Sequence, residues 1–440
     1  MFGFRKAFTA ATFTGESVGD LTLKKALVIS QVLGYTLSKY LGVKFLSEFR
    51  PEHRAWGLFA AIALAELSLV GFAVVPPGWR VVAIFLNGVP LAVIWGLVFS
   101  FLEGRRLSEI FGAGLSCSYI IGSGAAKSVG AEALSRGVPE NWMPAVAGLL
   151  YLPVFLISIW LLNKVPPPNA EDVAERVQRT RMNSRDRMAF LKEFGAGLLL
   201  LFSAYFFVTA YRDYRSDFAP EIFAELSAET EADLKQELAA LKSTDRVRAD
   251  ELRTEIEAVV QRYSDTTIFT RTEIPVALLV LAALGSLYLI RDNRKGFFWT
   301  HVMMGTGAVL VGVSTLLFDL GHVDGVYWMI LVGSGVFLTY VPYGCVLFDR
   351  LIAVVRTVGT AVFAIYVADA LGYTGTIGVI LYKELAYAET SNLDFFRSFS
   401  YFTSVVCTGA IAGSWVYFRR RRPHPDLTPP PTAPSPRTAS

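Results

Sequence analysis

The sequence predicts an all-α protein that crosses a membrane many times. Of its 440 residues, 53% are hydrophobic and only 18% are charged, which is too apolar for an ordinary soluble domain of this length. Apolar stretches of about twenty residues recur along the chain, each long enough to cross a hydrocarbon core of roughly 30 Å as a helix. The 36 glycines and 13% aromatic residues fit helices that pack closely and are anchored at membrane interfaces.

We expect about eleven membrane spans. In chain order they cover residues 21–44, 55–75, 79–102, 107–129, 142–162, 191–211, 274–290, 297–317, 326–348, 351–371 and 395–418. The stretch 372–381 is also apolar, but it is too short to cross alone. We expect it to prolong the preceding helix or to re-enter the membrane.

The distribution of basic residues predicts the orientation. Lys and Arg concentrate in alternate loops, around residues 44–54, 105–106, 176–187 and 291–295 and at Arg350. The positive-inside rule places these loops in the cytoplasm, together with the tail that opens at Arg419. An odd number of spans then places Met1 on the outer side.

Residues 1–11 are predicted to be the outer end of a first span whose beginning is not in the sequence. They are apolar and aromatic and contain Arg5 and Lys6, but no apolar stretch of about ten residues follows the basic pair, so they are not a signal peptide. A missed upstream start codon is our preferred hypothesis. A natural N-terminal segment that lies in the membrane interface is the alternative.

The chain is predicted to have two helical bundles. Residues 1–163 form the first, residues 164–190 form a Pro- and Arg-rich cytoplasmic linker, and residues 191–418 form the second. Val89 and Pro90 in the first half have a counterpart in Val341 and Pro342 in the second. Such weak internal symmetry is typical of membrane proteins that are built from repeats.

Two further segments have a different character. Residues 221–268 carry leucines at helical spacing between charged residues, which predicts an extracytoplasmic helical hairpin that turns near Ser243 and Thr244. The hairpin is a candidate lid or docking surface for a protein partner, and the alternative is an elaborated loop without such a role. Residues 419–440 are rich in Pro, Thr and Ser, so we expect a disordered tail.

Cations within or beside apolar spans are candidate binding residues. Lys39 and Lys127 lie inside spans, and Arg212 lies at the outer end of another. An ionised group in hydrocarbon costs at least a few kcal/mol, so such residues usually face a partner, a water-filled cavity or a ligand. The alternatives are interfacial anchoring for Arg212, pairing with an acid for Lys39, snorkelling for Lys127 and a plain exposed terminus for Arg5.

Acidic residues within spans allow the same two interpretations. Glu66 and Asp369 could each carry a proton or form a structural ion pair with a basic group. A separate set of charges is predicted to form a gating latch between the bundles on the cytoplasmic side, comprising Glu48, Arg50, Glu103, Arg105 and Arg106.

Three short motifs resemble the organophosphate:phosphate antiporter branch of the major facilitator superfamily. They combine cations with aromatic residues, an acid and a proline, namely Arg5, Lys6 and Phe8, then Ser38, Lys39 and Tyr40, and then Arg212, Asp217 and Pro220. Residues 31–48 and 101–106 look still more like an uncharacterised bacterial family, a domain of unknown function, in the same superfamily. The expected fold is therefore the two-bundle fold of that superfamily.

The resemblance implies a binding site. In the antiporter branch, the arginines that match Arg5 and Arg212 face each other across a central cavity and bind the substrate phosphate, and the lysine that matches Lys39 assists. The substrate-site histidine of the fifth helix falls at Tyr119 here, and Lys127 is a candidate replacement cation. Planar guanidinium groups also suit this chemistry, because they bind phosphate or carboxylate through two parallel hydrogen bonds.

Other functional classes find little support in the sequence. It has no phosphate-binding glycine loop, no metalloprotease motif and no nucleophile elbow. We expect no metal, cofactor or nucleic acid, because the histidines are scattered and the basic residues follow membrane topology. The cysteines are expected to be small core residues and are Cys117, Cys345 and Cys407.

The sequence thus predicts a secondary transporter of a small organic anion, phosphorylated or not, which works by alternating access. Its expected place is a bacterial inner membrane, with the C-terminus in the cytoplasm and the bilayer as its surroundings. The alternative from another class is a non-transporting sensor or scaffold of the same fold. A third interpretation is an exporter of hydrophobic compounds, which would tolerate the loss of Lys39.

Overall fold

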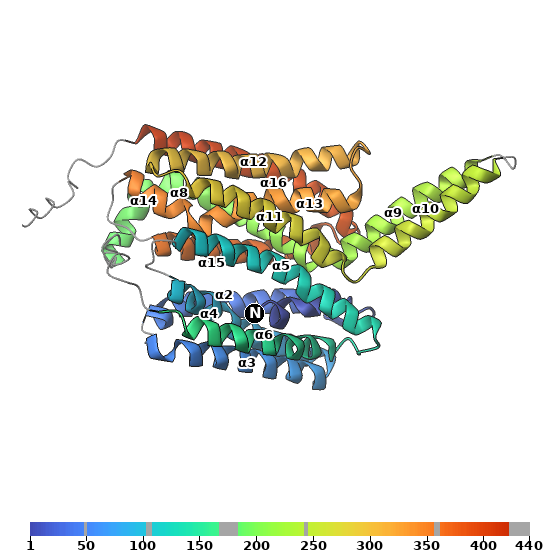
Figure 1. Cartoon of the computed structure of the whole chain (residues 1–440), viewed down its shortest axis with the longest axis horizontal. Helices are drawn as coiled ribbons and strands as arrows, with labels where there is room; N and C mark the ends of the chain where they lie inside the picture. Colours follow the sequence, from blue (N-terminus) through green and yellow to red (C-terminus); the bar gives the residue numbers. More distant parts are fainter. Residues whose placement is uncertain (48–50, 103–107, 167–183, 242–244, 356–360, 422–440) are drawn as a thin grey trace, which may run out of the picture.

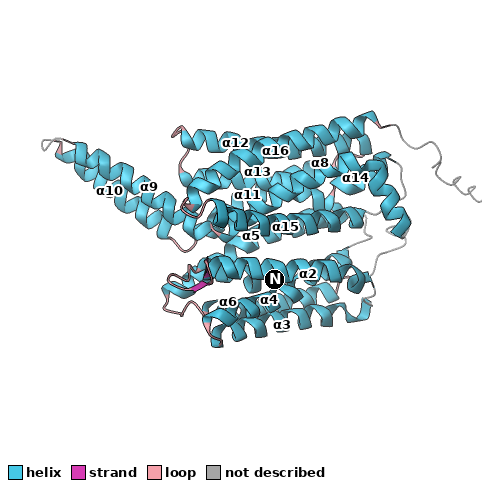
Figure 2. Ribbon diagram, turned by 180° about the vertical axis from the view of Figure 1, so that it is seen from behind, coloured by secondary structure: helices cyan, strands magenta, loops and turns pink. Residues whose placement is uncertain are grey.

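The computed structural model describes the chain except for residues 48–50, 103–107, 167–183, 242–244, 356–360 and 422–440. The described residues are almost entirely helical (Figure 2). The sole sheet among them pairs two short antiparallel strands, β1 (Ser17–Val18) and β2 (Leu21–Thr22). The predicted all-α polytopic fold is confirmed.

Helices of the first half form one bundle (Figure 1). They are α1 (Gly3–Lys6), α2 (Leu23–Ser47), α3 (Arg54–Val74), α4 (Pro77–Leu102), α5 (Ser108–Ser135) and α6 (Met143–Asn163), with the short 3₁₀ helices η1 (Ala7–Ala10) and η2 (Pro51–His53). Helix α4 packs against both α2 and α3, and α1 packs against α5 and α6.

Helices of the second half form the other bundle. They are α8 (Ser184–Asp217), α11 (Ile268–Tyr288), α12 (Asn293–Asp319), α13 (Gly325–Cys345), α14 (Leu347–Val355), α15 (Ala361–Ala386) and α16 (Asn392–Arg420). Helix α8 packs against α15 and α16, while α12 packs against α13 and α16. The two bundles meet where α5 packs against α11 and α2 packs against α15.

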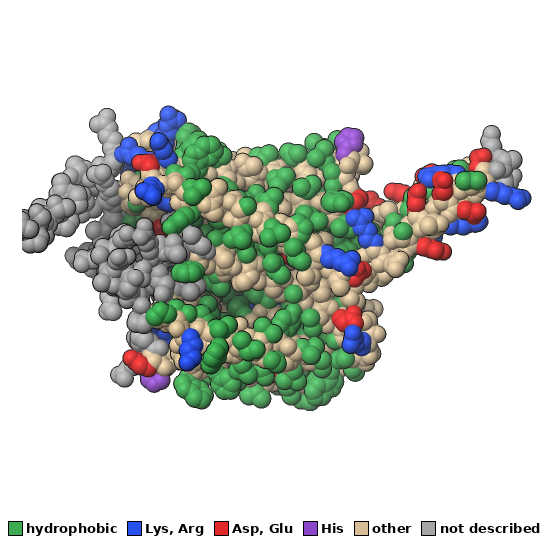
Figure 3. All heavy atoms as spheres, in the orientation of Figure 1, with side chains coloured by type: hydrophobic (Ala, Val, Ile, Leu, Met, Phe, Trp, Pro, Cys, Tyr) green, Lys and Arg blue, Asp and Glu red, His purple; other side chains and the backbone are tan. Residues whose placement is uncertain are grey.

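The surface of both bundles is suited to lipid. Among the described residues, nine helices are long and apolar enough to cross a membrane, and α2 and α5 have comparable lengths. Large apolar side chains such as Leu67, Trp160 and Val405 are more than 60% exposed, which a soluble surface would not sustain over this area. In Figure 3 hydrophobic side chains cover the middle of the visible face, whereas charged side chains gather at both ends and on a projecting arm.

One predicted span is wrong. The prediction covers residues 351–371, whereas α14 ends at Val355 and the membrane-length helix α15 extends from Ala361 to Ala386, with residues 356–360 outside the described part. Helix α14 buries Leu347, Phe348 and Leu351, so its apolar face made the sequence look continuous with the following span. The stretch 372–381 lies in the second half of α15, which agrees with the prediction that it prolongs a helix.

The two bundles repeat the same helix order. In the first half, α4 is the fourth helix after α1, α2 and α3 have been counted. In the second half, the long helices of the bundle come in the order α8, α11, α12 and α13, so α13 is also the fourth. The internal prolines Pro90 and Pro342 lie in these equivalent helices. The weak sequence symmetry thus corresponds to a structural one.

The arm consists of α9 (Ala219–Ala240) and α10 (Arg246–Ser264), which pack against each other and project beyond the bundles (Figures 1 and 2). Its base is tied to the start of α16. The Glu225 carboxylate accepts hydrogen bonds from the main-chain nitrogens of Asn392 (3.2 Å) and Leu393 (2.7 Å), and Arg397 pairs with Glu229 at 2.5 Å. The predicted turn of this hairpin lies outside the described residues.

Glycines allow α2 and α4 to approach closely. A Cβ atom on Gly34 would collide with the main-chain oxygen of Phe85, and one on Gly88 would collide with the main-chain oxygen of Gln31. Close backbone contact of this kind strengthens helix association in membranes through dispersion forces. The first bundle therefore depends on small residues at this interface.

We expect the substitution Gly34→Ala to destabilise the protein by about 1–3 kcal/mol, because the added methyl group must push α4 away. The measurement is thermal unfolding of the purified protein in detergent. Gly71→Ala in α3 is the matched control, since nothing lies within 4 Å of its Cβ position. A Gly34→Ala variant that melts with the control would show that the interface tolerates the methyl group.

Candidate functional site

A cavity of about 400 Å³ lies between the two bundles. Its walls come from α1, α2, α4, α5 and α6 on one side and from α8, α13 and α15 on the other. The volume falls in the range of small-molecule sites. The cavity lining brings together five of the predicted site residues, which are Arg5, Lys39, Tyr119, Arg212 and Asp369.

Arg5 is held in the cavity wall by the packing of α1. The Gln31 side-chain amide donates a hydrogen bond to the Arg5 main-chain oxygen (3.0 Å), and Asn87 donates one to the main-chain oxygen of Phe4 (3.1 Å). Only 4% of Arg5 is exposed, so the alternative of a plain exposed terminus is wrong. The local turn is therefore fixed by buried amides from α2 and α4.

The Arg5 guanidinium lies over aromatic rings and is not saturated with hydrogen bonds. Its Cζ atom is 4.2 Å from the centre of the Tyr35 ring and 5.8 Å from that of Tyr373. The Nε and Nη2 atoms are buried and have no hydrogen-bond partner among the residues that the structure describes. These two atoms form the side of a guanidinium that binds a carboxylate or phosphate through two parallel bonds.

Arg212 approaches the same rings from the other bundle. Its Cζ atom lies 4.0 Å from the Tyr340 ring and 6.0 Å from the Tyr373 ring, so both guanidinium groups share Tyr373. Unlike Arg5, it has a carboxylate partner, because its Nη2 atom is 2.7 Å from Asp213 Oδ1. The other Asp213 oxygen accepts a hydrogen bond from Thr376 at 2.9 Å, which connects α8 to α15.

Lys39 forms an ion pair across the bundle interface. Its Nζ atom in α2 lies 3.1 Å from Asp369 Oδ2 in α15, and the Tyr205 hydroxyl donates to the other Asp369 oxygen at 2.5 Å. The alternative of structural pairing for Lys39 thus holds in this conformation. The pair nevertheless belongs to the cavity lining, where a ligand could compete for it.

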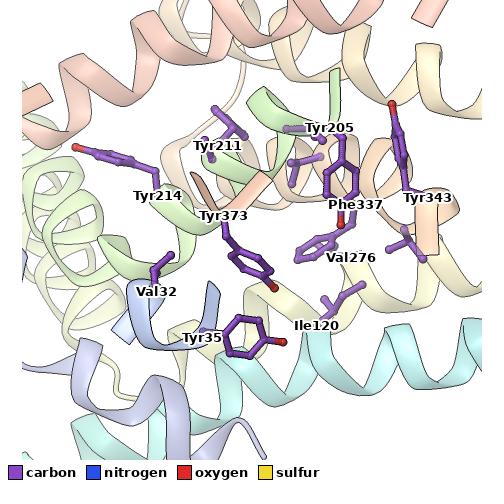
Figure 4. Close-up of a cluster of buried hydrophobic side chains, with 14 of the residues drawn as sticks. Val32, Tyr35, Ile120, Tyr205, Tyr211, Tyr214, Val276, Phe337, Tyr343 and Tyr373 are labelled. Atoms are coloured by element: carbon purple, nitrogen blue, oxygen red, sulfur yellow. The ribbon is translucent and has the colours of Figure 1, made fainter. Parts of the chain in front are cut away.

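Tyrosines frame the cavity. The rings of Tyr35 and Tyr373 meet at a centroid distance of 4.8 Å, and those of Tyr205 and Tyr340 stack at 5.2 Å (Figure 4 labels Tyr35, Tyr205 and Tyr373). Sequence reasoning missed this frame. The sequence pattern that could have revealed it places a tyrosine and a cation on the same face of a helix. Tyr35 precedes Lys39 by four residues, and Tyr205 precedes Arg212 by seven.

Ion pairs join the bundles at the end from which the arm projects, which we call the arm end. Three lysines of the first half pair with three acids of the second: Lys6 with Asp217, Lys24 with Glu221 at 2.5 Å, and Lys25 with Glu384. We call these three pairs the arm-end latch. With them in place, the two bundles are closed against each other at this end.

Three predicted site residues do not line the cavity. Lys127 donates to the main-chain oxygen of Ser216 (2.9 Å), and Asp217 belongs to the arm-end latch. Glu66 lies where α3 faces Gly148 of α6, and both of its carboxylate oxygens are buried without a hydrogen-bond partner among the described residues. The residues of the predicted cytoplasmic latch all lie outside the described part of the chain; they are Glu48, Arg50, Glu103, Arg105 and Arg106.

The described part of the chain offers no metal centre. No group of three or more His, Cys, Asp or Glu side chains within it could hold an ion. No disulfide joins the cysteines of the described residues, and Cys117 and Cys407 are buried. The polar groups that line the cavity include guanidinium, ammonium, carboxylate and phenol groups and the hydroxyls of several serines.

Two helical bundles with a cavity between them form a fold that solved structures share. The structure is similar to that of a D-xylose-proton symporter, with a TM-score of 0.59 and 13% identity over 94% of each chain. It is also similar to a variant of the nucleoside transporter NupG, with a TM-score of 0.53 and 12% identity over 95% of each chain. At such identities the likeness shows a shared fold.

The chain belongs to the Family of unknown function (DUF5690), which matches residues 7–241 and 240–421. The prediction of an uncharacterised family with this fold is confirmed. The resemblance to the organophosphate:phosphate antiporter branch stays a prediction. No curated protein matches the sequence.

The pair of Lys6 and Asp217 is almost completely buried, with 4% and 2% of the two side chains exposed. We expect Asp217→Asn to destabilise the protein by about 3–5 kcal/mol, because it leaves a buried lysine without a counter-charge. Thermal unfolding in detergent is the measurement.

Two controls accompany this variant. The double substitution Lys6→Leu and Asp217→Leu removes both charges and should recover most of the lost stability. Lys235→Gln breaks an ion pair with Glu231 in the arm, where 61% of the lysine side chain is exposed, and should leave the melting temperature unchanged. Equal melting of Asp217→Asn and Lys235→Gln would contradict the expectation.

Proposed function

We propose that the protein is a secondary transporter of a small organic anion that works by alternating access. The observation that supports this most is the buried, unbonded side of Arg5, placed opposite Arg212 in a cavity that both bundles share. Burial is costly for a cation with vacant donors, so such a group is most readily explained by an anionic ligand. The transported anion would supply the missing acceptors.

A shared cavity couples binding to movement. Arg5 belongs to the first bundle and Arg212 to the second, so an anion held by both would draw the two halves together. The low dielectric between stacked tyrosine rings strengthens this attraction relative to water. Rocking of one bundle against the other would then open the site to alternate sides of the membrane.

The arm-end latch is the proposed outer gate. We place the protein in a bacterial inner membrane. By the positive-inside rule, we expect the arm on the outer side and the end of α16, with Arg419 and Arg420, on the cytoplasmic side. In that orientation the described conformation is closed to the outside. Opening would separate the three lysines of the latch from their carboxylates and expose these charges to water. Hydration of the charges would offset part of the free energy lost with the ion pairs.

Exchange for a second anion or coupling to a proton would reset the carrier. Asp369 is the coupling candidate with the most direct geometry, since a proton on its carboxylate would release Lys39 to the cavity. Glu66 is a second candidate, because its oxygens accept no hydrogen bond from the described residues and a neutral, protonated form suits such a site.

A sensor or scaffold of the same fold is the second candidate function, and the projecting arm favours it. The arm carries many exposed charges and is anchored to α16 through Glu225 and Glu229, so it could pass a conformational change to a protein partner. Such a protein would bind the anion without carrying it.

We expect proteoliposomes to take up the transported anion through the wild-type protein, and Arg5→Gln and Arg212→Gln each to lose this uptake. Removing either guanidinium takes one bundle out of the shared site. Arg136→Gln is the control, because 77% of its side chain is exposed at the end of α5. If the wild-type protein binds the anion but does not take it up into proteoliposomes, the sensor is favoured.

Cross-linking tests the proposed gate. In a variant with the native cysteines replaced by alanine, we expect a cleavable thiol cross-linker between Lys25→Cys and Glu384→Cys to stop uptake, and a reductant to restore it. The matched control is Glu237→Cys with Arg248→Cys, an ion pair within the arm at 2.9 Å, where cross-linking should leave uptake unchanged. Full uptake in the cross-linked 25/384 variant would exclude movement at this end.

A further inference from the structure

The cationic side chains that line the cavity outnumber the carboxylates that pair with them by one. Four cationic side chains line it: Arg5, Lys6, Lys39 and Arg212. The last three each form an ion pair with an aspartate, namely Asp217, Asp369 and Asp213 in that order. Arg5 forms none, so a single positive charge remains for a ligand.

The geometry of this remaining charge selects the shape of the anionic group. The atoms Nε and Nη2 of Arg5, buried and without a bond among the described residues, lie along the same edge of the planar guanidinium group, where two parallel hydrogen bonds to one carboxylate form. A phosphate monoester can use the same side, but it brings close to two negative charges at neutral pH. The second charge would have to be neutralised by a group already bonded to an aspartate.

The surroundings of Arg5 select the rest of the molecule. Tyr35 and Tyr373 lie against its guanidinium, and Phe2, Tyr119 and Phe337 continue the aromatic lining along the cavity. Ring centroids within about 4.5–7 Å of each other are the distances at which a further ring can stack or pack edge-to-face. A flat, ring-bearing body can therefore pack against this aromatic part of the lining.

We infer that the site takes a monocarboxylate with a flat aromatic body in preference to a phosphate ester. This inference rests on the proposed function for the identity of the site, and it adds the charge and shape of the ligand. The carboxylate pairs with Nε and Nη2 of Arg5, and the ring packs among the tyrosines. The three aspartate-paired cations keep their present partners, and Arg212 attracts the carboxylate across the cavity without releasing Asp213.

Two probes with the same ring test the charge preference. Binding of phenylacetate, a monoanion, and of phenyl phosphate, mainly a dianion at about pH 7.5, is measured by calorimetry on the full-length protein in detergent. We expect phenylacetate to bind at least about tenfold more tightly, and acetate, which lacks the ring, to bind more weakly than phenylacetate. Tighter binding of phenyl phosphate, or no binding of phenylacetate, would overturn the inference.

Variants separate charge from geometry. Arg5→Lys keeps the charge but loses the two-bond side, so phenylacetate binding should weaken. Asp369→Asn keeps the shape of the Asp369 side chain and removes its negative charge, which should shift the preference toward phenyl phosphate. A phenylacetate preference that is unchanged in Asp369→Asn would contradict the charge argument.

Uptake in proteoliposomes separates this inference from the proposed function. Phenylacetate that binds as expected but is not taken up supports the ligand class and refutes transport. Uptake of phenyl phosphate in preference to phenylacetate supports transport and refutes the ligand class. Arg136→Gln serves again as the control for protein quality in both measurements.

Discussion

The need to neutralise buried cations organises the centre of this molecule. A charge within a membrane protein is stable only beside an opposite charge, a dipole or a ligand, because hydrocarbon and close-packed side chains cannot replace its hydration shell. Lys6, Lys39 and Arg212 satisfy this condition with aspartates, and two of these pairs cross the bundle interface. The same pairs that stabilise the buried lysines therefore hold the two bundles together.

Arg5 differs from these cations because aromatic rings replace the carboxylate. The quadrupole of a tyrosine face attracts a guanidinium without consuming its hydrogen-bond donors. Tyr35 and Tyr373 come from different bundles, so the arrangement that accommodates Arg5 also depends on how the halves are positioned. The contact with these rings thus stabilises the Arg5 charge while leaving its hydrogen-bond donors available.

Sequence reasoning predicted the parts of this structure that depend on local pattern. Hydropathy located most of the long apolar helices among the described residues, and isolated charges in apolar segments pointed to Lys39, Arg212 and Asp369, which line the cavity. It could not predict contacts between distant positions: Lys6 and Asp217 lie 211 residues apart, and nothing local distinguishes that partner from other acids. The error at residues 351–371 has a similar cause, since hydropathy does not separate an apolar face buried in protein from one that meets lipid.

The arm has a mechanical consequence. Helix α9 begins two residues after α8 ends, and its 22 residues span ~33 Å at 1.5 Å per residue. Because Glu225 and Glu229 fasten its base to α16, a rotation of the second bundle would swing the arm as a rigid lever. A tilt of a few degrees, hard to detect among packed helices, becomes a displacement of ångströms at the far tip. A small rotation of the helices within the membrane would therefore produce a larger displacement of the arm tip in the surrounding water.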